Sequence, residues 1–448
     1  STPKPSSAAS DVYKRQMKRL FILTTFLLCI SPICLNAQEL TLEECQQQAR
    51  AHYPLIKRYG LIEKTKEYNI SNADKGYLPQ VSLSAKASYQ SDVTEIPVDL
   101  PGIDIRGMRK DQYQAMLQLD QVVWDGGNIR ARKEVTRATS EVDKQKLEVD
   151  MYAINERVNQ LFFGILLLKE QLKQNQLMQE ELQRNYDNVT AYVKNGIANQ
   201  ADLDAVKVEQ LNNIQQRHTL EATYRAYSEM LKIMINHPTP LTGNTLKKPD
   251  VNALLYKGEA YSAEFIRRPE LNLFAAQNQQ LEAQRKQLTA KNLPRLGIFV
   301  QGAYGNPGLN MLKNEFSAYY VAGVRLSWNF SNLYTRKNES RQLILNQQDV
   351  NVQKETFLFN THLEITQNNS EIKKLTELMK NDEEIITLRN NIKKSAQAKV
   401  ANGTLTVTEM LREVTAENIA RQDKILHEIQ LLSAIYELKY TTNQYENK

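Results

Sequence analysis

Two stretches of the chain alternate apolar and polar residues, which is the pattern of a β-strand with one face turned away from water. Between residues 81 and 90, apolar side chains stand at odd positions and polar ones at even positions. The stretch 112–120 follows the same alternation at most positions. Glycine and proline are concentrated around them, in 77–127 and again in 293–332. The pattern predicts strands in both regions, each with an apolar and a polar face.

The segments that follow these regions are long and nearly free of helix breakers. No proline occurs between Pro101 and Pro238, and none occurs after Pro307. The segments are rich in Gln, Glu, Lys, Leu and Ala, which favour helix. A single helix over 128–194 would contain 67 residues and extend about 100 Å. A helix of that length indicates coiled-coil packing against neighbouring helices.

The two halves of the chain repeat each other. Residues 77–83 recur as 292–298, at a shift of 215 residues. Residues 193–196 recur as 400–403, at a shift of 207, and the stretch 113–119 recurs at this second shift as well. An eight-residue difference in the loop that joins the two strands accounts for both shifts. Each half is therefore predicted to contain a helix, two strands, a long helix, an Asn-Gly turn and a helix.

Both Asn-Gly pairs lie where a long helix must reverse into an antiparallel neighbour. The first pair is Asn195-Gly196 and the second is Asn402-Gly403. Such a reversal needs a residue that tolerates positive φ, and glycine does so without steric cost. An ordinary exposed turn would explain one pair. Two pairs at equivalent positions indicate the apices of two helical hairpins.

The apolar face of the four predicted strands needs a cover. A soluble sheet would bury that face under an apolar layer, but the neighbouring segments are long polar helices. Lipid is the alternative cover, with a polar lumen inside, and we favour it. Four strands cannot close a transmembrane barrel, and open sheet edges are not viable in lipid. We therefore expect a membrane β-barrel that several copies of the chain close together, continued by a long α-helical coiled-coil barrel.

The beginning of the chain has the features of an export signal. Residues 17–37 contain a basic start, an apolar core and a small residue at the end, so cleavage is expected after Ala37. Residues 1–16 precede this start methionine and are interpreted as a non-native upstream segment. We divide the remainder into a first structural repeat (38–236), a linker or equatorial region (237–262) and a second structural repeat (263–448).

Charge and candidate chemistry argue against several functions. The formal net charge of +6 comes mostly from the leader, because residues 38–448 hold 52 cations and 50 acids, so nothing favours nucleic-acid binding. Of the three cysteines only Cys45 lies outside the leader, which leaves no intramolecular disulfide and no cysteine metal site. The five histidines have no metal-ligand spacing. We expect no catalytic residues, no metal and no cofactor.

With this organisation, several motifs make residues 38–448 similar to the TolC-like outer membrane efflux protein family. The motifs are Leu42-Glu43-Glu44, Pro54, Tyr77-Leu78-Pro79, Trp124-Asp125-Gly126-Gly127, Arg130, the two Asn-Gly turns and Leu293-Pro294-Arg295. Asp125, Gly126 and Gly127 mark the junction between the second strand and the long helix. The second copy reads Asn332-Leu333-Tyr334 at the position compared with them, so a different turn is expected there.

The resemblance implies a homotrimer with a twelve-stranded barrel in the outer membrane of a Gram-negative bacterium and a helical barrel across the periplasm. Such a protein is the exit duct of a tripartite efflux or type I secretion system. It passively conducts substrates from an inner-membrane transporter and a periplasmic adaptor. The resemblance implies that the adaptor contacts the periplasmic tip at Asn195, Gly196, Asn402 and Gly403.

The resemblance also suggests residues for a pore constriction. Family members often have acidic residues just after the second tip turn, and Glu409 falls on the first such position. Arg412 occupies the next one, and Asp202 is the equivalent of Glu409 in the first copy. A solvated surface charge is the ordinary alternative for Glu409. Arg412 would offset an acidic ring or pair with Glu409 at i, i+3.

The competing interpretation is a soluble periplasmic coiled-coil scaffold or adaptor. It retains the leader and the helices but leaves the four alternating segments without a partner surface, so we favour the duct. Trp124 and Trp328 have two explanations at this stage. They belong either to the interfacial aromatic girdle of a barrel or to the packing of the strand-to-helix junctions.

Overall fold

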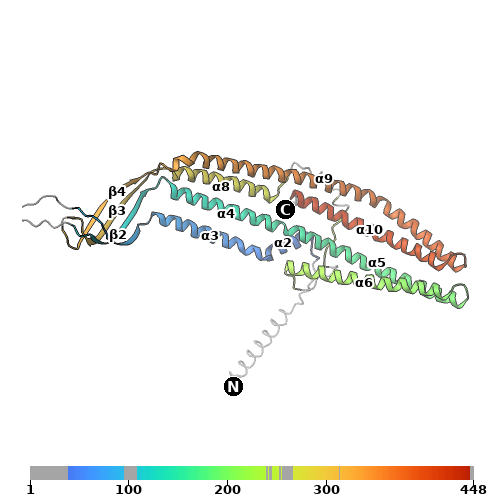
Figure 1. Cartoon of the computed structure of the whole chain (residues 1–448). Helices are drawn as coiled ribbons and strands as arrows, with labels where there is room; N and C mark the ends of the chain where they lie inside the picture. The colour runs from blue at the N-terminus through green and yellow to red at the C-terminus, as the bar shows by residue number, and fades with distance from the viewer. Residues whose placement is uncertain are drawn as a thin grey trace, which may run out of the picture.

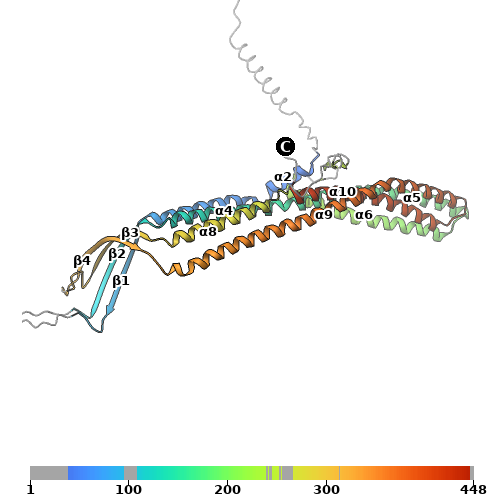
Figure 2. The same cartoon turned by 90° about the horizontal axis from the view of Figure 1, so that it is seen from above.

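The chain forms an elongated molecule with a β-sheet at one end and the turns of two helical hairpins at the other (Figures 1 and 2). The residues that the computed structural model describes are 39–94, 108–238, 241, 245–251, 254, 266–311 and 313–443. The predicted upstream segment and signal peptide lie outside the described residues, as does most of the predicted linker.

The four strands form one sheet, antiparallel throughout, in the order β1-β2-β3-β4. The strands are β1 (Gln80–Tyr89), β2 (Asp111–Trp124), β3 (Arg295–Asn306) and β4 (Ser317–Ser327). Each half of the chain contributes one hairpin, and the ladder between β2 and β3 joins the two halves. The prediction of four strands per chain from two strand–helix repeats is confirmed.

The separation of apolar and polar faces runs across the whole sheet. One row of paired residues on the apolar face consists of Leu83, Leu117, Gly302 and Tyr320. The next row, on the other face, contains Gln118, which pairs with Gln301. The Gln301 amide donates a 2.9 Å hydrogen bond to the Gln118 side chain. Because side chains alternate along every strand, this register places paired residues on the same face across all four strands.

Helices lead into and out of each strand hairpin. Those before β1 are α2 (Leu42–His52), the short 3₁₀ turns η1 (Pro54–Ile56) and η2 (Lys75–Tyr77), and α3 (Lys57–Asp74). Those after β2 are α4 (Asn128–Tyr152), α5 (Ile154–Lys194) and α6 (Gln200–Ile235). In the second half they are α8 (Pro269–Lys291) before β3, and α9 (Asn332–Ala401) and α10 (Val407–Thr442) after β4. Among the described helices, none is long and apolar enough to cross a membrane.

The prediction of one uninterrupted helix over 128–194 was wrong at Ala153, where α4 ends and α5 begins. The cause lies in the packing of Tyr152. Its ring stacks on Tyr440 at 4.8 Å, and its hydroxyl donates a 2.6 Å hydrogen bond to the Tyr440 carbonyl oxygen. Arg268 covers the same two rings at about 5 Å. The corresponding helix of the second half, α9, is continuous over 70 residues.

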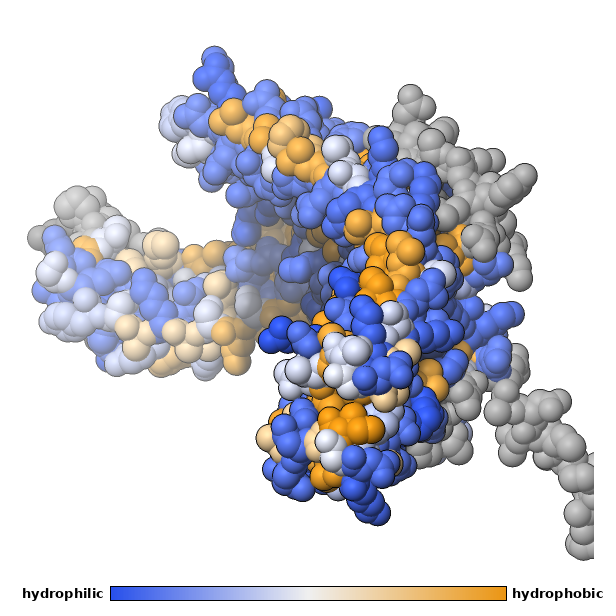
Figure 3. Space-filling model, turned by 90° about the vertical axis from the view of Figure 1, so that its right-hand side faces the viewer, coloured by the Kyte–Doolittle hydropathy of each residue, from blue (hydrophilic) through white to orange (hydrophobic). Residues whose placement is uncertain are grey.

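Two apolar clusters hold the hairpins together. The larger lies where α2, α5, α6 and α10 meet, and it contains the fully buried Phe162, Leu231 and Leu432. The smaller lies near the hairpin turns and contains Leu182 and Val414. Seen from the turns, the molecule is mostly hydrophilic, with hydrophobic residues exposed in strips between polar ones (Figure 3).

Candidate functional site

The apolar face of the sheet is uncovered. Leu83 is 77% exposed and Tyr320 is 78% exposed, although both belong to a continuous apolar row. The described helices extend away from one end of the sheet and do not lie across it (Figures 1 and 2). Soluble monomers rarely expose an apolar surface of this extent. The face therefore meets lipid or another molecule.

Aromatic side chains stand at both ends of this apolar face. Tyr113 and Tyr304 stack against Phe316 at the end away from the helices, with ring centroids 6.3 and 5.6 Å apart. Trp124 and Trp328 stand at the helical end, and both are about half exposed. Between Tyr113 and Trp124 the strand extends roughly 36 Å, which a tilt of about 40° reduces to roughly 28 Å of height. This height matches the apolar band of an outer-membrane barrel.

Trp328 packs at a strand-to-helix junction, which is one of the two explanations that the sequence left open. Its indole Nε1 donates a 3.1 Å hydrogen bond to the Asn292 carbonyl oxygen at the end of α8. Its ring also packs against Phe330, at 4.6 Å between centroids, while remaining about half exposed. The residue thus holds the strand-to-helix junction and presents an aromatic surface beside the apolar face.

Asp125 organises the first strand-to-helix junction. It is buried, and its carboxylate accepts hydrogen bonds from the backbone N–H groups of Gly127 (2.9 Å) and Ile129 (2.6 Å). These bonds satisfy donors that the first turn of α4 leaves free. Gly126 and Gly127 have φ of 71° and 81°, and a Cβ on Gly126 would lie 2.6 Å from the Leu293 Cβ. The junction therefore requires glycine for conformation and for space.

The second junction uses Asn329, which the sequence comparison did not identify. The Asn329 side chain accepts a 3.0 Å hydrogen bond from the Ser331 backbone N–H, as Asp125 does from Gly127. Asp125 and Asn329 are 204 residues apart, so the prediction that Asn332, 207 residues on, corresponds to Asp125 was wrong. Strand β2 has 14 residues and β4 has 11, so the helix begins three residues earlier in the second copy. The shift between the copies is 207 residues both within these strands and at the Asn-Gly turns. It therefore did not reveal that β4 is three residues shorter than β2.

The predicted Asn-Gly turns lie together at the end opposite the sheet (Figure 1). In the first turn, Gly196 has φ of 73° and donates to the Val193 carbonyl oxygen at 3.1 Å, while the Ile197 N–H reaches the Tyr192 carbonyl oxygen at 2.9 Å. This is a Schellman motif, which satisfies the last carbonyls of a helix. Gly403, with φ of 68°, makes the same pair of bonds in the second turn.

The constriction candidates Asp202 and Glu409 have a structural role in the first turns of α6 and α10. Each is the third helical residue of a reciprocal capping box, with Asn199 and Thr406 as the respective N-caps. The Glu409 carboxylate accepts from the Thr406 backbone N–H at 3.1 Å, and this bond, then one from the Thr406 hydroxyl, lowers the pKa of Glu409. The spacing Thr-x-x-Glu was a readable signal that the sequence analysis missed.

Arg412 lies one turn further along α10 and is exposed. Among the described residues, the structure contains no ion pair between Arg412 and Glu409, so the i, i+3 pairing left open by the sequence is not formed. The Arg412 charge still contributes, least of the causes, to the lowered pKa of Glu409. Arg412 forms no ion pair with any residue that the structure describes, and its side chain is exposed to groups outside the chain.

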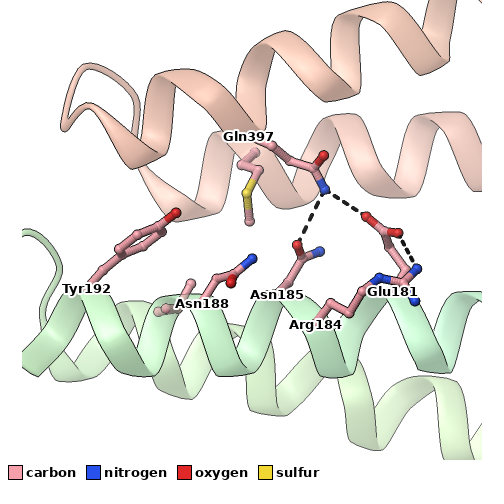
Figure 4. A pocket seen from close by; sticks show the side chains of 8 residues that line it. Glu181, Arg184, Asn185, Asn188, Tyr192 and Gln397 are labelled. Carbon is pink, nitrogen blue, oxygen red and sulfur yellow. Dashed lines mark hydrogen bonds and ion pairs between the residues drawn. The ribbon is translucent and has the colours of Figure 1, made fainter.

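A cavity of about 260 Å³ separates the two hairpins above their turns (Figure 4). The Gln397 amide from α9 donates to Glu181 at 2.7 Å and to Asn185 at 3.4 Å, both on α5. Burial acts to raise the pKa of Glu181, but hydrogen bonds from Arg184 and Gln397 and the charge of Lys393 lower it overall. Residues 181 and 397 are distant in sequence, so only the packing of the hairpins reveals this site.

No group of acidic, histidine and cysteine side chains in the described part of the chain has the geometry of a metal site. Cys45 is buried, and burial, followed by the charges of Glu44 and Glu43, raises the pKa of its thiol to about 12. This thiol has no arrangement that would activate it.

Solved outer-membrane channels share this fold. The CusC transmembrane channel matches with a TM-score of 0.66 and 13% identity, over 90% of this chain and 91% of CusC. The outer-membrane channel OprN matches with 0.65 and 13%, over 90% of each chain. The Campylobacter jejuni CmeC outer membrane channel matches with 0.62 and 14%, over 90% of this chain and 85% of CmeC. No curated protein matches the sequence.

The described fold, a short antiparallel sheet that continues into long helical hairpins, is the fold of these solved channels. Residues 45–237 match the model of the outer membrane efflux protein family. The predicted family is thereby confirmed. The family consists of efflux channels and not of enzymes.

Proposed function

We propose that this chain is the protomer of an outer-membrane exit duct of a tripartite efflux system. The observation that carries the proposal is the four-stranded sheet, whose apolar face is exposed and bordered by aromatic residues at both ends. Lipid would cover that face, and the polar face, with Gln118 and Gln301, would line an aqueous lumen. The long hairpins would extend the duct across the periplasm.

Three copies would complete the duct. One chain supplies four strands and ends its sheet at β1 and β4, so closure requires strands from other copies. Three copies supply twelve, the number implied by the family resemblance. Apolar residues on the helices of the single chain are also exposed, among them Leu61, Ile233, Leu345 and Phe359. Neighbouring copies would bury them.

The two hairpin turns are the proposed contact for a periplasmic adaptor, which joins the duct to an inner-membrane transporter. Asn195, Gly196, Asn402 and Gly403 are exposed at this end and present backbone that a partner can approach closely. Asp202, Glu409 and Arg412 follow the turns and would line the constriction. Conduction through such a duct is passive and needs no cofactor. Export of the chain would use the signal at 17–37, cleaved near Ala37.

A charge placed on either face of one strand tests the membrane assignment. Leu83→Asp adds a carboxylate to the apolar face, where lipid makes it cost up to about 2 kcal/mol per copy. Ser84→Asp adds the same group to the opposite face of β1 and is the matched control. We expect ion-conducting steps in planar bilayers from the unmodified protein and from Ser84→Asp, with greatly reduced insertion for Leu83→Asp. Equal insertion of both variants would contradict the proposal.

Separate measurements address assembly and gating. Native mass spectrometry in detergent is expected to show three copies, while a soluble monomer on cell fractionation would support the scaffold interpretation. Glu409→Ala and Arg412→Ala are expected to change the conductance if these residues line the constriction. Unchanged conductance for both variants would remove them from it.

A further inference from the structure

The interiors of the two hairpins differ in charge at equivalent positions. Asn175 on α5 corresponds to Asp382 on α9, and Gln210 on α6 corresponds to Glu417 on α10, both at the shift of 207. All four side chains are buried, with exposed fractions of 1%, 6%, 2% and 5% respectively. At both of these pairs of positions, the first copy thus has a neutral amide and the second copy has a carboxylate.

Amides connect α5 to α6 at these positions in the first hairpin, and the exposed Lys207 of α6 also donates to the Gln210 side-chain oxygen at 3.3 Å. The Asn175 side-chain nitrogen donates to the backbone and side-chain oxygens of Asn213, at 3.0 and 2.8 Å. The Gln210 side-chain nitrogen donates to the Leu182 carbonyl oxygen at 3.4 Å and to the Gln183 side chain at 3.0 Å. These bonds join α5 to α6 without burying a charge.

Ion pairs replace the amides in the second hairpin. Lys393 of α9 donates to one Glu417 oxygen at 3.3 Å, and Arg421 of α10 donates to the other. The Lys393 and Glu417 side chains are 12% and 6% exposed, so water screens the pair little. The cluster has charged neighbours on two sides. Arg389, one turn further from the tip than Lys393 on α9, pairs with Glu413, one turn nearer to the tip than Glu417 on α10. Glu181 of α5 lies within electrostatic reach of Lys393.

We propose that Glu417 is the positioning residue of the second hairpin, which fixes α9 on α10 through Lys393 and thereby places the turn at Asn402-Gly403. Lys393 lies about 15 Å along the helix from Gly403, so the clamp acts close to the turn. A buried ammonium group needs a paired anion. Without the Glu417 charge, Lys393 turns to Glu181, on which its charge already acts. This draws α9 towards the first hairpin and away from α10.

Hydrogen exchange on the full-length protein in detergent tests the clamp. Glu417→Gln imitates Gln210 of the first hairpin and leaves Lys393 without its partner. We expect the amides of 393–417 to exchange at least tenfold faster, with 186–210 unchanged. Glu413→Gln, which removes the more exposed pair with Arg389, is the matched control and is expected to change exchange less than threefold. Lys393→Met combined with Glu417→Gln removes both charges and is expected to restore protection.

Each result bears on the proposal in a definite way. Restoration by the double variant supports charge pairing, because a packing role alone would make it no better than Glu417→Gln. Unchanged exchange in Glu417→Gln, or equal loss in Glu413→Gln, overturns the proposal. The inference concerns the hairpin itself and goes beyond the proposed duct. A protein that conducts normally but shows no exchange difference refutes the clamp alone, and one that shows the difference without conducting refutes the duct alone.

Discussion

Helices α6 and α10 each contain 36 residues, begin with a capping box and follow a glycine turn of the same geometry, yet they are joined to their partners by different chemistry. Amides connect α5 to α6, whereas the ion pair between Lys393 and Glu417 connects α9 to α10. The backbone signals that end and start a helix act locally and are the same in both copies. The chemistry between helices depends on pairs of positions, and these pairs differ between the two copies.

The strand-to-helix junctions differ in a comparable way. In the first turn, two glycines at positive φ follow Asp125. In the second turn, Phe330 and Ser331 follow Asn329 instead of glycines. Both use a side-chain oxygen to accept a backbone N–H two residues on. One hydrogen-bonding role thus serves two backbone paths, because β2 and β4 differ in length.

Exchanging the interior chemistry between the hairpins is expected to have the largest effect. Asn175→Asp turns a carboxylate towards the two oxygens of Asn213 that now accept from the amide, and it should destabilise the fold by about 4 kcal/mol. The reverse exchange, Asp382→Asn, keeps an oxygen beside His427, 3.0 Å away, and should cost only about 1 kcal/mol. Denaturant midpoints in detergent measure the difference, and equal losses would show that the interiors are interchangeable.

The first junction offers the next largest effect. Gly126→Ala combines a strained positive φ with a Cβ that meets Leu293, and we expect a loss of about 3 kcal/mol. Gly127→Ala shares the positive φ but places its Cβ in open space, so its expected loss is about 1 kcal/mol. The same unfolding measurement applies. A larger loss at Gly127 than at Gly126 would mean that contact with Leu293 is not what requires glycine.

The smallest effect is expected at the second tip and depends on pH. The pKa of Glu409 is lowered in the folded chain, so its contribution is present above the unfolded carboxyl value, about 4.3, and is lost as the pH falls through the folded value. Exchange of the amides of 406–410, corrected for intrinsic rates, should therefore increase below about pH 4. Glu409→Gln should remove this dependence, and a dependence that persists in the variant would assign it to another group.

Several features of the fold could be predicted because their signals are local. Alternation along 81–90 predicted the strand, and the paired face formed as expected because a strand's side chains point to opposite sides. The Asn-Gly pairs predicted the hairpin turns, since a positive φ at Gly196 and Gly403 depends on the residue itself. The break at Ala153 could not be predicted, because Tyr440, which holds Tyr152, lies nearly 290 residues away.

The sequence by itself determined the duplication, the four strands and the places where the helices reverse, because periodicity and turn residues act over a few positions. Only the tertiary structure decided which buried groups meet. It placed Glu417 against Lys393, matched Asn329 with Asp125, and brought Glu181 beside Gln397. Such contacts depend on the register between helices and strands, and that register is set by packing over the whole length of the molecule.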